Sequence, residues 1–264
     1  MTDPKTIKLD SILKDAKSIV IAFSGGVDSS FLAWHAAAIS NLKIVAVTIR
    51  TPYMPSREIR EASEFAARHN IKHEIIDMPF PEIVRHNPVE RCYLCKKTLF
   101  ARIVEYARVN GFRYIADGTN ADDTLAHRPG LRALNEHEIL SPLAASGFTK
   151  KDIREKLLNA GLELWDKPAM ACLMTRIPYD TEVNESMLRM IENAEEFLMV
   201  NGYPGTRVRV HNDMVRIECL PGYIEKIVNN SQREMIVGEL KKIGFRYISL
   251  DLEGYRTGSM DKKS

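Results

Sequence analysis

The segment SGGVDSS (24–30) has the composition of a phosphate-binding loop. Gly25 and Gly26 can adopt positive φ, so that backbone N–H groups converge on an anion. The nearby hydroxyl donors are Ser24, Ser29 and Ser30. Asp28 would repel an anion unless it orients the loop or helps to hold Mg²⁺, which makes it a catalytic candidate. The segment matches neither GxxxxGK[ST] nor GxGxxG, and a tight turn with incidental serines is the alternative.

A second polar segment, DGTNADD (117–123), follows an apolar run that ends at Ala116. Because the carboxyl ends of parallel strands meet at one edge of a sheet, we expect it to face the same ligand. Its candidate nucleotide-binding residues are Asp117, Thr119, Asn120 and Asp123. A turn rich in Asp and Asn with a helix cap is the alternative. Arg128 is a further candidate for a phosphate contact, with a solvated arginine as its alternative.

The cysteines could hold a metal centre. Cys92 and Cys95 are three residues apart, so a helix would place both thiolates on one face. Two ligands are too few, and Cys172, in the irregular stretch 162–180, could supply a third. Three thiolates suit a 4Fe-4S cluster with one open iron, or zinc with an open position; burial in the core is the alternative. Cys219 ends an alternating strand and is predicted to be structural.

These residues need a sheet edge to position them. Apolar runs predict buried strands at 18–23, 43–49, 72–77 and 113–118. Stretches with helical periodicity separate the runs, with helices at 29–39, 56–69 and 92–110. Thr149 and Asp152 predict a capping box for a helix to about 160, with Phe148 stapled onto Ile153. The alternation predicts an α/β fold with a doubly wound parallel sheet of the Rossmann-like kind.

A smaller α+β domain is expected after the irregular stretch, with the boundary near 180, giving domains 1–180 and 181–264. One apolar helical face is predicted at Met187, Leu188, Ile191, Ala194, Phe197 and Leu198. Two alternating strands, helices near 221–229 and 231–243, and the strand FRYISL follow. Arg207 and Arg209 alternate with valines, so both guanidinium groups should share one strand face and could grip a phosphate. An exposed face with ordinary arginines is the alternative.

Bulk properties narrow the function classes. The chain has 264 residues, 45% of them hydrophobic, and a net charge of +2, which gives no overall attraction to nucleic acid or membrane lipid. The N-terminal stretch is charged and lacks the apolar region of a signal peptide, and no stretch is apolar enough to span a bilayer. We therefore expect a cytoplasmic protein with reduced cysteines and no membrane association.

The motifs together resemble a known family. SGGxDS is similar to the PP-loop of the adenine nucleotide alpha-hydrolase-like enzymes, which split ATP between its α and β phosphates. The wider set resembles the LarE family of ATP-dependent sulfur transferases over nearly the whole chain, on SGGVDSS, NPxxRCYLCKxxLF (87–100), DGTNADD with RPGLRAL, KPAMACLMTRIPY, RVRV and DLEGYRTGSM. The resemblance implies adenylation of the carboxylates of pyridinium-3,5-biscarboxylic acid mononucleotide, with release of AMP and pyrophosphate, followed by conversion to thiocarboxylates for the nickel-pincer cofactor.

Two sulfur sources are associated with that family. In one branch the ACLxxR cysteine, here Cys172, attacks the acyl adenylate and then loses its sulfur, leaving dehydroalanine. In the other branch three cysteines hold a 4Fe-4S cluster that carries an extra sulfide. The CxxC pair together with Cys172 favours the cluster branch, with Cys92, Cys95 and Cys172 as ligands and ATP and Mg²⁺ as further cofactors.

The resemblance also implies the substrate contacts and partners. Arg176, Arg207 and Arg209 would hold the 5′-phosphate of the mononucleotide, and the implied partners are a sulfide donor, a downstream nickel-insertion protein and further copies in a homo-oligomer. Two rival functions share some of the motifs. A cluster-dependent tRNA thiolase would be expected to show a basic footprint, which the near-neutral charge argues against. A non-catalytic adenine-nucleotide sensor would bind ATP without releasing pyrophosphate.

Overall fold

The computed structural model describes residues 3–125, 130–168, 171–256 and 258–260. The chain divides into two compact units. Unit 1 consists of Met1–Ile83 with Glu90–Met170, and unit 2 of Val84–Val89 with Ala171–Ser264.

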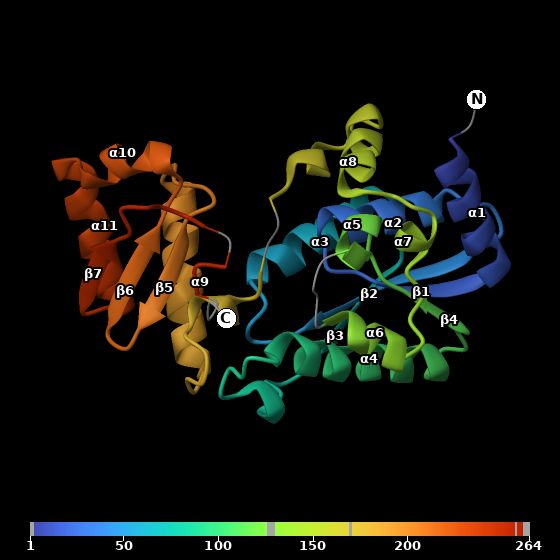
Figure 1. The fold of residues 1–264 in the computed structure, drawn as a ribbon, viewed down its shortest axis with the longest axis horizontal. Coiled ribbons are helices and arrows are strands. Elements are labelled where there is room, and N and C mark those ends of the chain that lie inside the picture. The colour runs from blue at the N-terminus through green and yellow to red at the C-terminus, as the bar shows by residue number, and fades with distance from the viewer. Residues whose placement is uncertain (1–2, 126–129, 169–170, 257, 261–264) are drawn as a thin grey trace. The chain divides into compact units, whose positions relative to one another are not determined.

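A parallel four-stranded sheet lies at the centre of unit 1 (Figure 1). Its strands are β1 (Ser18–Ala22), β2 (Lys43–Arg50), β3 (His73–Asp77) and β4 (Tyr114–Ala116). The order β3-β2-β1-β4 means that the chain moves outward from β1 through β3 and then returns to the other side of β1. The carboxyl ends of β1 and β4 therefore flank the topological switch point, where folds of this kind bind ligands.

Helices cover both faces of this sheet. The α-helices of unit 1 are α1 (Pro4–Ala16), α2 (Val27–Ala37), α3 (Ser56–Arg68), α4 (Arg91–Val109), α5 (Ala121–Leu125), α6 (Gly130–Glu136), α7 (Pro142–Ala145) and α8 (Lys150–Asn159), with the 3-10 helices η1 (Glu82–Val84) and η2 (Glu163–Asp166). Ile19 and Ile21 of β1 pack with α1, α2, α3 and α8, whereas Val20 packs with α4 and α6. These two groups of helices lie on opposite faces of the sheet (Figure 1). The doubly wound α/β fold is thus confirmed.

The start of α8 matches its sequence signals. The Thr149 hydroxyl accepts a hydrogen bond from the Asp152 backbone N–H at 3.2 Å, and the Asp152 carboxylate accepts one from the Thr149 backbone N–H at 2.8 Å. Phe148 and Ile153, predicted to staple the turn, are fully buried in one core cluster. None of the helices in the described ranges is apolar over a length that would cross a membrane.

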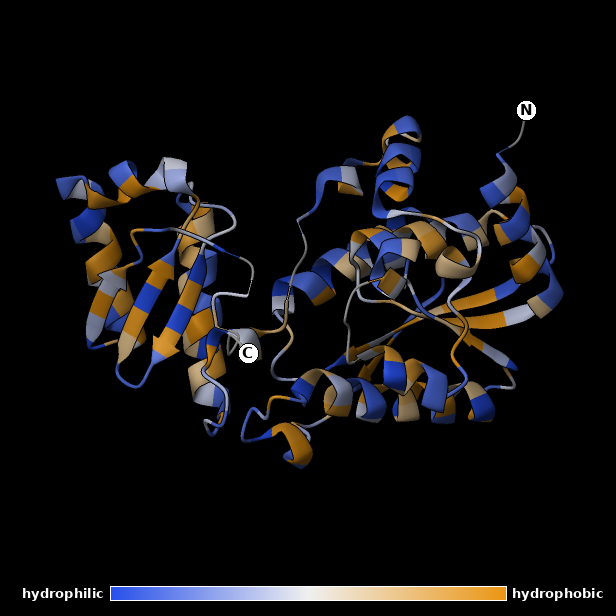
Figure 2. Cartoon of the chain, viewed as in Figure 1, coloured by the Kyte–Doolittle hydropathy of each residue, from blue (hydrophilic) through white to orange (hydrophobic). Residues whose placement is uncertain are grey.

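Unit 2 is an α+β body with a three-stranded sheet in the order β5-β6-β7. Its elements are η3 (Leu173–Arg176), α9 (Glu185–Val200), β5 (Arg207–His211), β6 (Met214–Glu218), η4 (Pro221–Tyr223), α10 (Ile224–Val228), α11 (Asn230–Ile243) and β7 (Tyr247–Leu250). Along β5 and β6 apolar and polar residues alternate (Figure 2). Val208, Val215 and Ile217 are buried, as are Leu188 of α9 and Ile236 of α11. The opposite face of the sheet carries charged side chains.

Asn87 belongs to the body of unit 2 although it precedes α4. Its buried side-chain NH₂ group donates to the carbonyls of Ile177 at 2.9 Å and Pro178 at 3.0 Å, and its backbone carbonyl accepts from the Asp180 N–H at 3.2 Å. The segment 171–180 was predicted to close the first domain, but these hydrogen bonds tie it to unit 2. Along the chain the boundary therefore falls between 170 and 171, ahead of the expected boundary near 180.

Candidate functional site

The loop after β1 depends on glycine at one position. Gly25 has a φ of +71°, and a Cβ on this residue would lie 2.7 Å from the Ala62 Cβ of α3. A side chain is therefore excluded both by backbone strain and by the close approach of α3. Gly26 is the N-cap of α2 and has no side chain to accept from the first helical amides. The first turn of α2 thus presents N–H groups at the switch point, as an anion site requires.

The serines of the loop fasten it to α2. The hydroxyls of Ser24 and Ser29 lie 3.1 Å apart, and the Ser29 hydroxyl also donates to the Gly26 carbonyl at 3.2 Å. Ser30 is fully buried, and its hydroxyl has no hydrogen-bond partner among the described residues. Of the three predicted hydroxyl donors, Ser24 and Ser29 therefore already serve to hold the loop in shape.

Asp28 lies in the first turn of α2, where a carboxylate interacts favourably with the helix dipole. Its Oδ2 accepts a hydrogen bond from the Lys150 ammonium at 2.7 Å. Its Oδ1 is buried and has no hydrogen-bond partner among the described residues. A carboxylate oxygen in this state fits the coordination chemistry of Mg²⁺, a cation that prefers oxygen ligands.

The 117–123 segment reaches the same place. A Cβ on Gly118 would lie 2.7 Å from the Ser29 backbone N, so the absence of a side chain lets this segment contact the start of α2. All four candidates in the segment are buried: Asp117, Thr119, Asn120 and Asp123. The phosphate-facing candidate Arg128 lies outside the described residues.

Internal hydrogen bonds occupy these candidates. The Asp117 carboxylate accepts from the hydroxyls of Thr119 and of Ser141, the latter at 2.7 Å. The Asn120 side chain accepts from the Asp123 N–H at 3.2 Å, and the Asp123 carboxylate accepts from the Asn120 N–H at the same distance. This reciprocal pair caps α5, so the helix-cap interpretation holds alongside any nucleotide contact.

Lys167 also takes part in the loop, which its sequence context did not indicate. Its ammonium donates to the Gly25 carbonyl at 3.1 Å and pairs with Glu58 at 2.8 Å and Glu61 at 2.9 Å. Burial alone would raise the pKa of the Glu61 carboxyl, but hydrogen bonds from Lys167 and Arg57 lower that pKa below its ordinary value. In the structure Lys167 braces the PP-loop candidate against α3.

The cysteines are divided between the units. Cys92 is exposed and Cys95 half-buried at the start of α4, and the Cys95 Sγ lies 3.1 Å from the hydroxyl of the buried Tyr53. Cys172 belongs to unit 2, where it is the N-cap of η3. Cys219 is fully buried, and burial raises the pKa of its thiol, in keeping with the structural role predicted for it. Within the described residues, no group of three or more His, Cys, Asp or Glu side chains is arranged to hold a metal ion.

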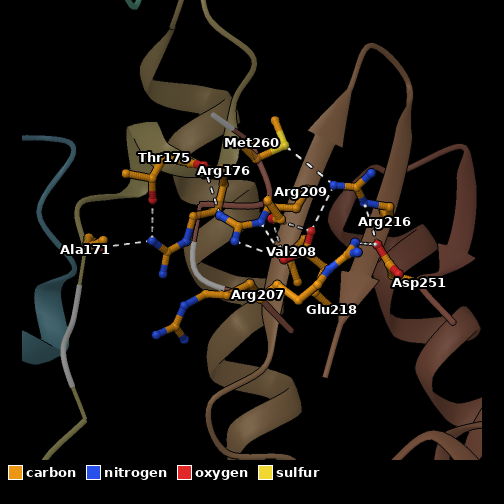
Figure 3. A network of polar contacts seen from close by, with 12 residues as sticks. Ala171, Thr175, Arg176, Arg207, Val208, Arg209, Arg216, Glu218, Asp251 and Met260 are labelled. Atoms are coloured by element: carbon orange, nitrogen blue, oxygen red, sulfur yellow. Dashed lines mark hydrogen bonds and ion pairs between the residues drawn. The ribbon is translucent and has the colours of Figure 1, made fainter. Parts of the chain in front are cut away.

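A row of arginines covers the charged face of the unit 2 sheet (Figure 3). Arg209 is buried beside the fully buried Glu218, with Nε at 2.9 Å from the Glu218 Oε2, and donates to the Thr175 carbonyl at 2.9 Å. Glu218 also accepts from Arg216 at 2.8 Å. The strand face is therefore not the exposed surface that the alternative interpretation assumed.

The other two predicted phosphate ligands lie on the same body of unit 2. Arg176 is 1% exposed and pairs with Glu195 at 2.9 Å through both Nε and Nη2. Arg207 is also buried; desolvation and the charges of Arg176 and Arg209 lower the pKa of its guanidinium. Glu195 was not predicted as a site residue, because a glutamate on a helix carries no sequence signal for which arginine it will meet.

The chain is similar to known proteins over nearly its whole length. Residues 11–117 match the family model described as asparagine synthase. An uncharacterised protein of Synechocystis is 34% identical over 265 residues, covering 99% of this chain and 98% of that protein, and one of Methanocaldococcus jannaschii is 35% identical over 258 residues, covering 96% and 98%. The pyridinium-3,5-bisthiocarboxylic acid mononucleotide synthase of Lactiplantibacillus plantarum is 31% identical over 260 residues, covering 97% of this chain and 94% of the synthase. With a PP-loop domain and a relative matched from end to end, the chain belongs to the LarE family of the PP-loop superfamily.

Proposed function

We propose that the protein is an ATP-dependent sulfur transferase that converts carboxylates of pyridinium-3,5-biscarboxylic acid mononucleotide to thiocarboxylates. A substrate carboxylate oxygen attacks the α-phosphorus of ATP, the bond to the bridging oxygen breaks, and pyrophosphate leaves. A sulfur nucleophile then attacks the acyl carbon, and AMP leaves with the electrons of the acyl–oxygen bond. The observation that carries the proposal is the glycine-dependent loop at the exit of β1, where no side chain caps the first amides of α2 and the Asp28 Oδ1 has no hydrogen-bond partner within the described residues.

The loop and α2 would bind the pyrophosphate portion of ATP. The N–H groups at Gly25, Gly26 and the first turn of α2 favour an anion. Asp28 fits a ligand to Mg²⁺, which would neutralise phosphate charge when bound. The 117–123 segment, packed against Ser29 through Gly118, is the proposed second side of the nucleotide site.

The proposed sulfur carrier is a 4Fe-4S cluster on Cys92, Cys95 and Cys172. Cys92 and Cys95 follow shortly after the chain passes from unit 2 into unit 1, and Cys172 follows shortly after it returns. The helical spacing and partial exposure of the first two thiols fit two ligands of one centre. When bound, such a cluster leaves one iron open for exchangeable sulfide.

The alternative sulfur source is Cys172 itself. Its thiolate would form a thioester at the acyl carbon with loss of AMP. Removal of the α-proton and cleavage of the Cβ–Sγ bond would then leave the thiocarboxylate and dehydroalanine at 172. This route consumes one protein chain for each sulfur, whereas the cluster route allows turnover.

The arginine row of unit 2 is the proposed site for the 5′-phosphate. Arg176, Arg207 and Arg209 are all buried. The positive charges of Arg176 and Arg209 repel that of Arg207 and, together with burial, lower the pKa of its guanidinium. A phosphate would relieve that repulsion. A sulfide donor, a nickel-inserting partner and self-association stay predictions from the resemblance.

Pyrophosphate release tests the function. The protein, reconstituted with iron and sulfide without oxygen, is incubated with ATP, Mg²⁺ and the dicarboxylate mononucleotide. We expect pyrophosphate, AMP and a thiocarboxylate product by mass spectrometry, and about four irons per chain. Cys92→Ser should lose the iron, with Cys219→Ser as the matched control outside the proposed ligand set. Pyrophosphate without any thiocarboxylate refutes sulfur transfer. Dehydroalanine at 172 in an iron-free active protein refutes the cluster route.

A further inference from the structure

The loop SGGVDSS, which would hold pyrophosphate, contains no lysine. The structure supplies an ammonium from elsewhere. Lys150, the first residue of α8, reaches across the fold to the Asp28 carboxylate at 2.7 Å. Side-chain exposure is 34% for Lys150 and 21% for Asp28, so solvent and ligands have access to the pair.

The backbone of Lys150 is fixed at this place. Its N–H donates to the Asp122 carboxylate at 2.8 Å, which joins the start of α8 to the 117–123 segment. The capping box of Thr149 and Asp152 sets the direction of the helix. Asp152 in turn pairs with Lys5 of α1 at 2.6 Å. The base of the side chain is held, while its flexible four-carbon stem leaves the ammonium able to move.

In the ligand-free protein Asp28 is the partner of the Lys150 ammonium. Without a nucleotide, Lys150 offsets the charge of a carboxylate whose Oδ1 is buried without a hydrogen-bond partner among the described residues. A polyphosphate on the loop offers denser negative charge within reach of the same stem, and a cation on Asp28 would compete for the Oδ2 that Lys150 occupies.

We propose that Lys150 is a phosphate-binding residue that moves from Asp28 to the pyrophosphate portion of ATP and so replaces the lysine that the loop lacks. The inference rests on the proposed use of ATP and deepens it, because it assigns a residue and a part of the nucleotide that one group recognises. Lys150 contacts the β and γ phosphates, so it stabilises the leaving group and contributes nothing to the binding of AMP.

Equilibrium binding by calorimetry tests this assignment with three probes: ATP with Mg²⁺, inorganic pyrophosphate, and AMP. Lys150→Met should weaken the binding of ATP and of pyrophosphate by about 10- to 100-fold, the worth of a charged hydrogen bond. AMP binding should not change. Lys150→Arg, which keeps the charge, should lose less. Lys151→Met is the matched control, because Lys151 carries the same charge on the next residue of α8 and its side chain is 84% exposed.

The outcomes separate the two proposals. If the wild-type protein binds neither ATP nor pyrophosphate, the use of ATP fails and this inference fails with it. If the wild type binds both and Lys150→Met binds them as Lys151→Met does, this inference alone is overturned. Equal losses for ATP and AMP in Lys150→Met also overturn it, because they would show that Lys150 acts only through the shape of the site.

A second pair of variants tests the movement. Asp28→Asn removes the resting partner of Lys150, so metal-free pyrophosphate should bind more tightly than to the wild type. The gain should disappear in the double variant Asp28→Asn with Lys150→Met. A gain that persists in the double variant, or no gain in Asp28→Asn, overturns the proposed movement.

Discussion

Glu218 offers a sharp test of how unit 2 holds its arginines. Its side chain is fully buried, and its two oxygens accept from Arg209 at 2.9 Å and from Arg216 at 2.8 Å (Figure 3). They also accept from the Ser259 hydroxyl, at 2.8 and 3.0 Å. Glu218→Gln keeps the shape of this residue and removes its charge. The Arg209 guanidinium, 6% exposed, is then left buried without its carboxylate.

The expected cost follows from burial. Removing one partner of a buried ion pair costs about 3–5 kcal/mol, because the remaining charge stays desolvated. The glutamine oxygen retains a hydrogen bond worth about 1 kcal/mol. We therefore expect the free energy of unfolding of unit 2 to fall by about 2–4 kcal/mol. With a urea slope of about 2 kcal/mol/M, the unfolding midpoint of unit 2 should fall by about 1–2 M.

The assay can separate the units, because both tryptophans, Trp34 and Trp165, lie in unit 1. Tryptophan fluorescence reports the unfolding of unit 1, while far-ultraviolet circular dichroism reports both units. Glu239→Gln is the matched control in unit 2, since Glu239 forms an exposed pair with Lys242 at 3.1 Å and should cost less than about 1 kcal/mol. If the two variants shift the dichroism transition equally, the buried carboxylate does not hold the arginines as argued.

Three further perturbations have outcomes set by the structure. Gly118→Ala would place a Cβ 2.7 Å from the Ser29 backbone N, so it should lower the free energy of unfolding by about 1–3 kcal/mol and weaken ATP binding. Gly238→Ala is the control in α11, where a Cβ meets open space, and urea unfolding should show it to be more stable by up to about 1 kcal/mol. Burial alone would raise the pKa of the Asp152 carboxyl, but hydrogen bonds from Lys5 and Thr149 lower it from 3.8 to about 2. The stability from Asp152 is therefore full above pH 3.8 and lost as pH falls through about 2, so the melting temperature of Asp152→Asn should depend less on pH in that window. In native protein, iodoacetamide should modify the exposed Cys92 and spare the buried Cys219, as peptide masses would show; rapid modification of Cys219 without urea would contradict its burial.

Local signals explain what the sequence could predict. The apolar runs and the glycine pair define β1, its loop and α2 through neighbouring residues alone, and the structure begins α2 at Val27, where the sequence placed the helix start at 29. The difference arises because Gly26 is the N-cap, so Asp28 and Ser29 belong to the first helical turn although their polarity is typical of a loop. The capping box of α8 also depends only on residues close in sequence, and the structure confirms it.

Long-range partners could not be predicted in this way. Lys150 meets Asp28 from 122 residues away, and Lys167 meets Gly25 from 142 residues away. Asn87 joins the segment 171–180 to unit 2 by hydrogen bonds to residues about 90 positions away, so the boundary between the units precedes this segment instead of following it. Each of these contacts depends on which elements the folded sheet brings together, and a lysine or an asparagine alone in a sequence does not reveal its partner.

Three of the cations proposed to bind anions follow one electrostatic pattern. Lys150 pairs with Asp28, Arg176 with Glu195 and Arg209 with Glu218, so each of these three cations has a carboxylate beside it. A buried cation without a partner would cost several kcal/mol in the ligand-free protein, and the carboxylate removes that cost. The same carboxylate opposes an incoming phosphate, so binding requires either that the cation move, as its flexible stem allows for Lys150, or that the carboxylate keep one edge of a guanidinium while the phosphate takes another. The mobile ammonium of lysine permits the cation to move, and the five N–H donors of arginine permit it to contact the carboxylate and the phosphate at once. Exchanging Lys150 for arginine should therefore preserve charge but slow the exchange between partners, whereas lysine at 209 should lose either Glu218 or the ligand.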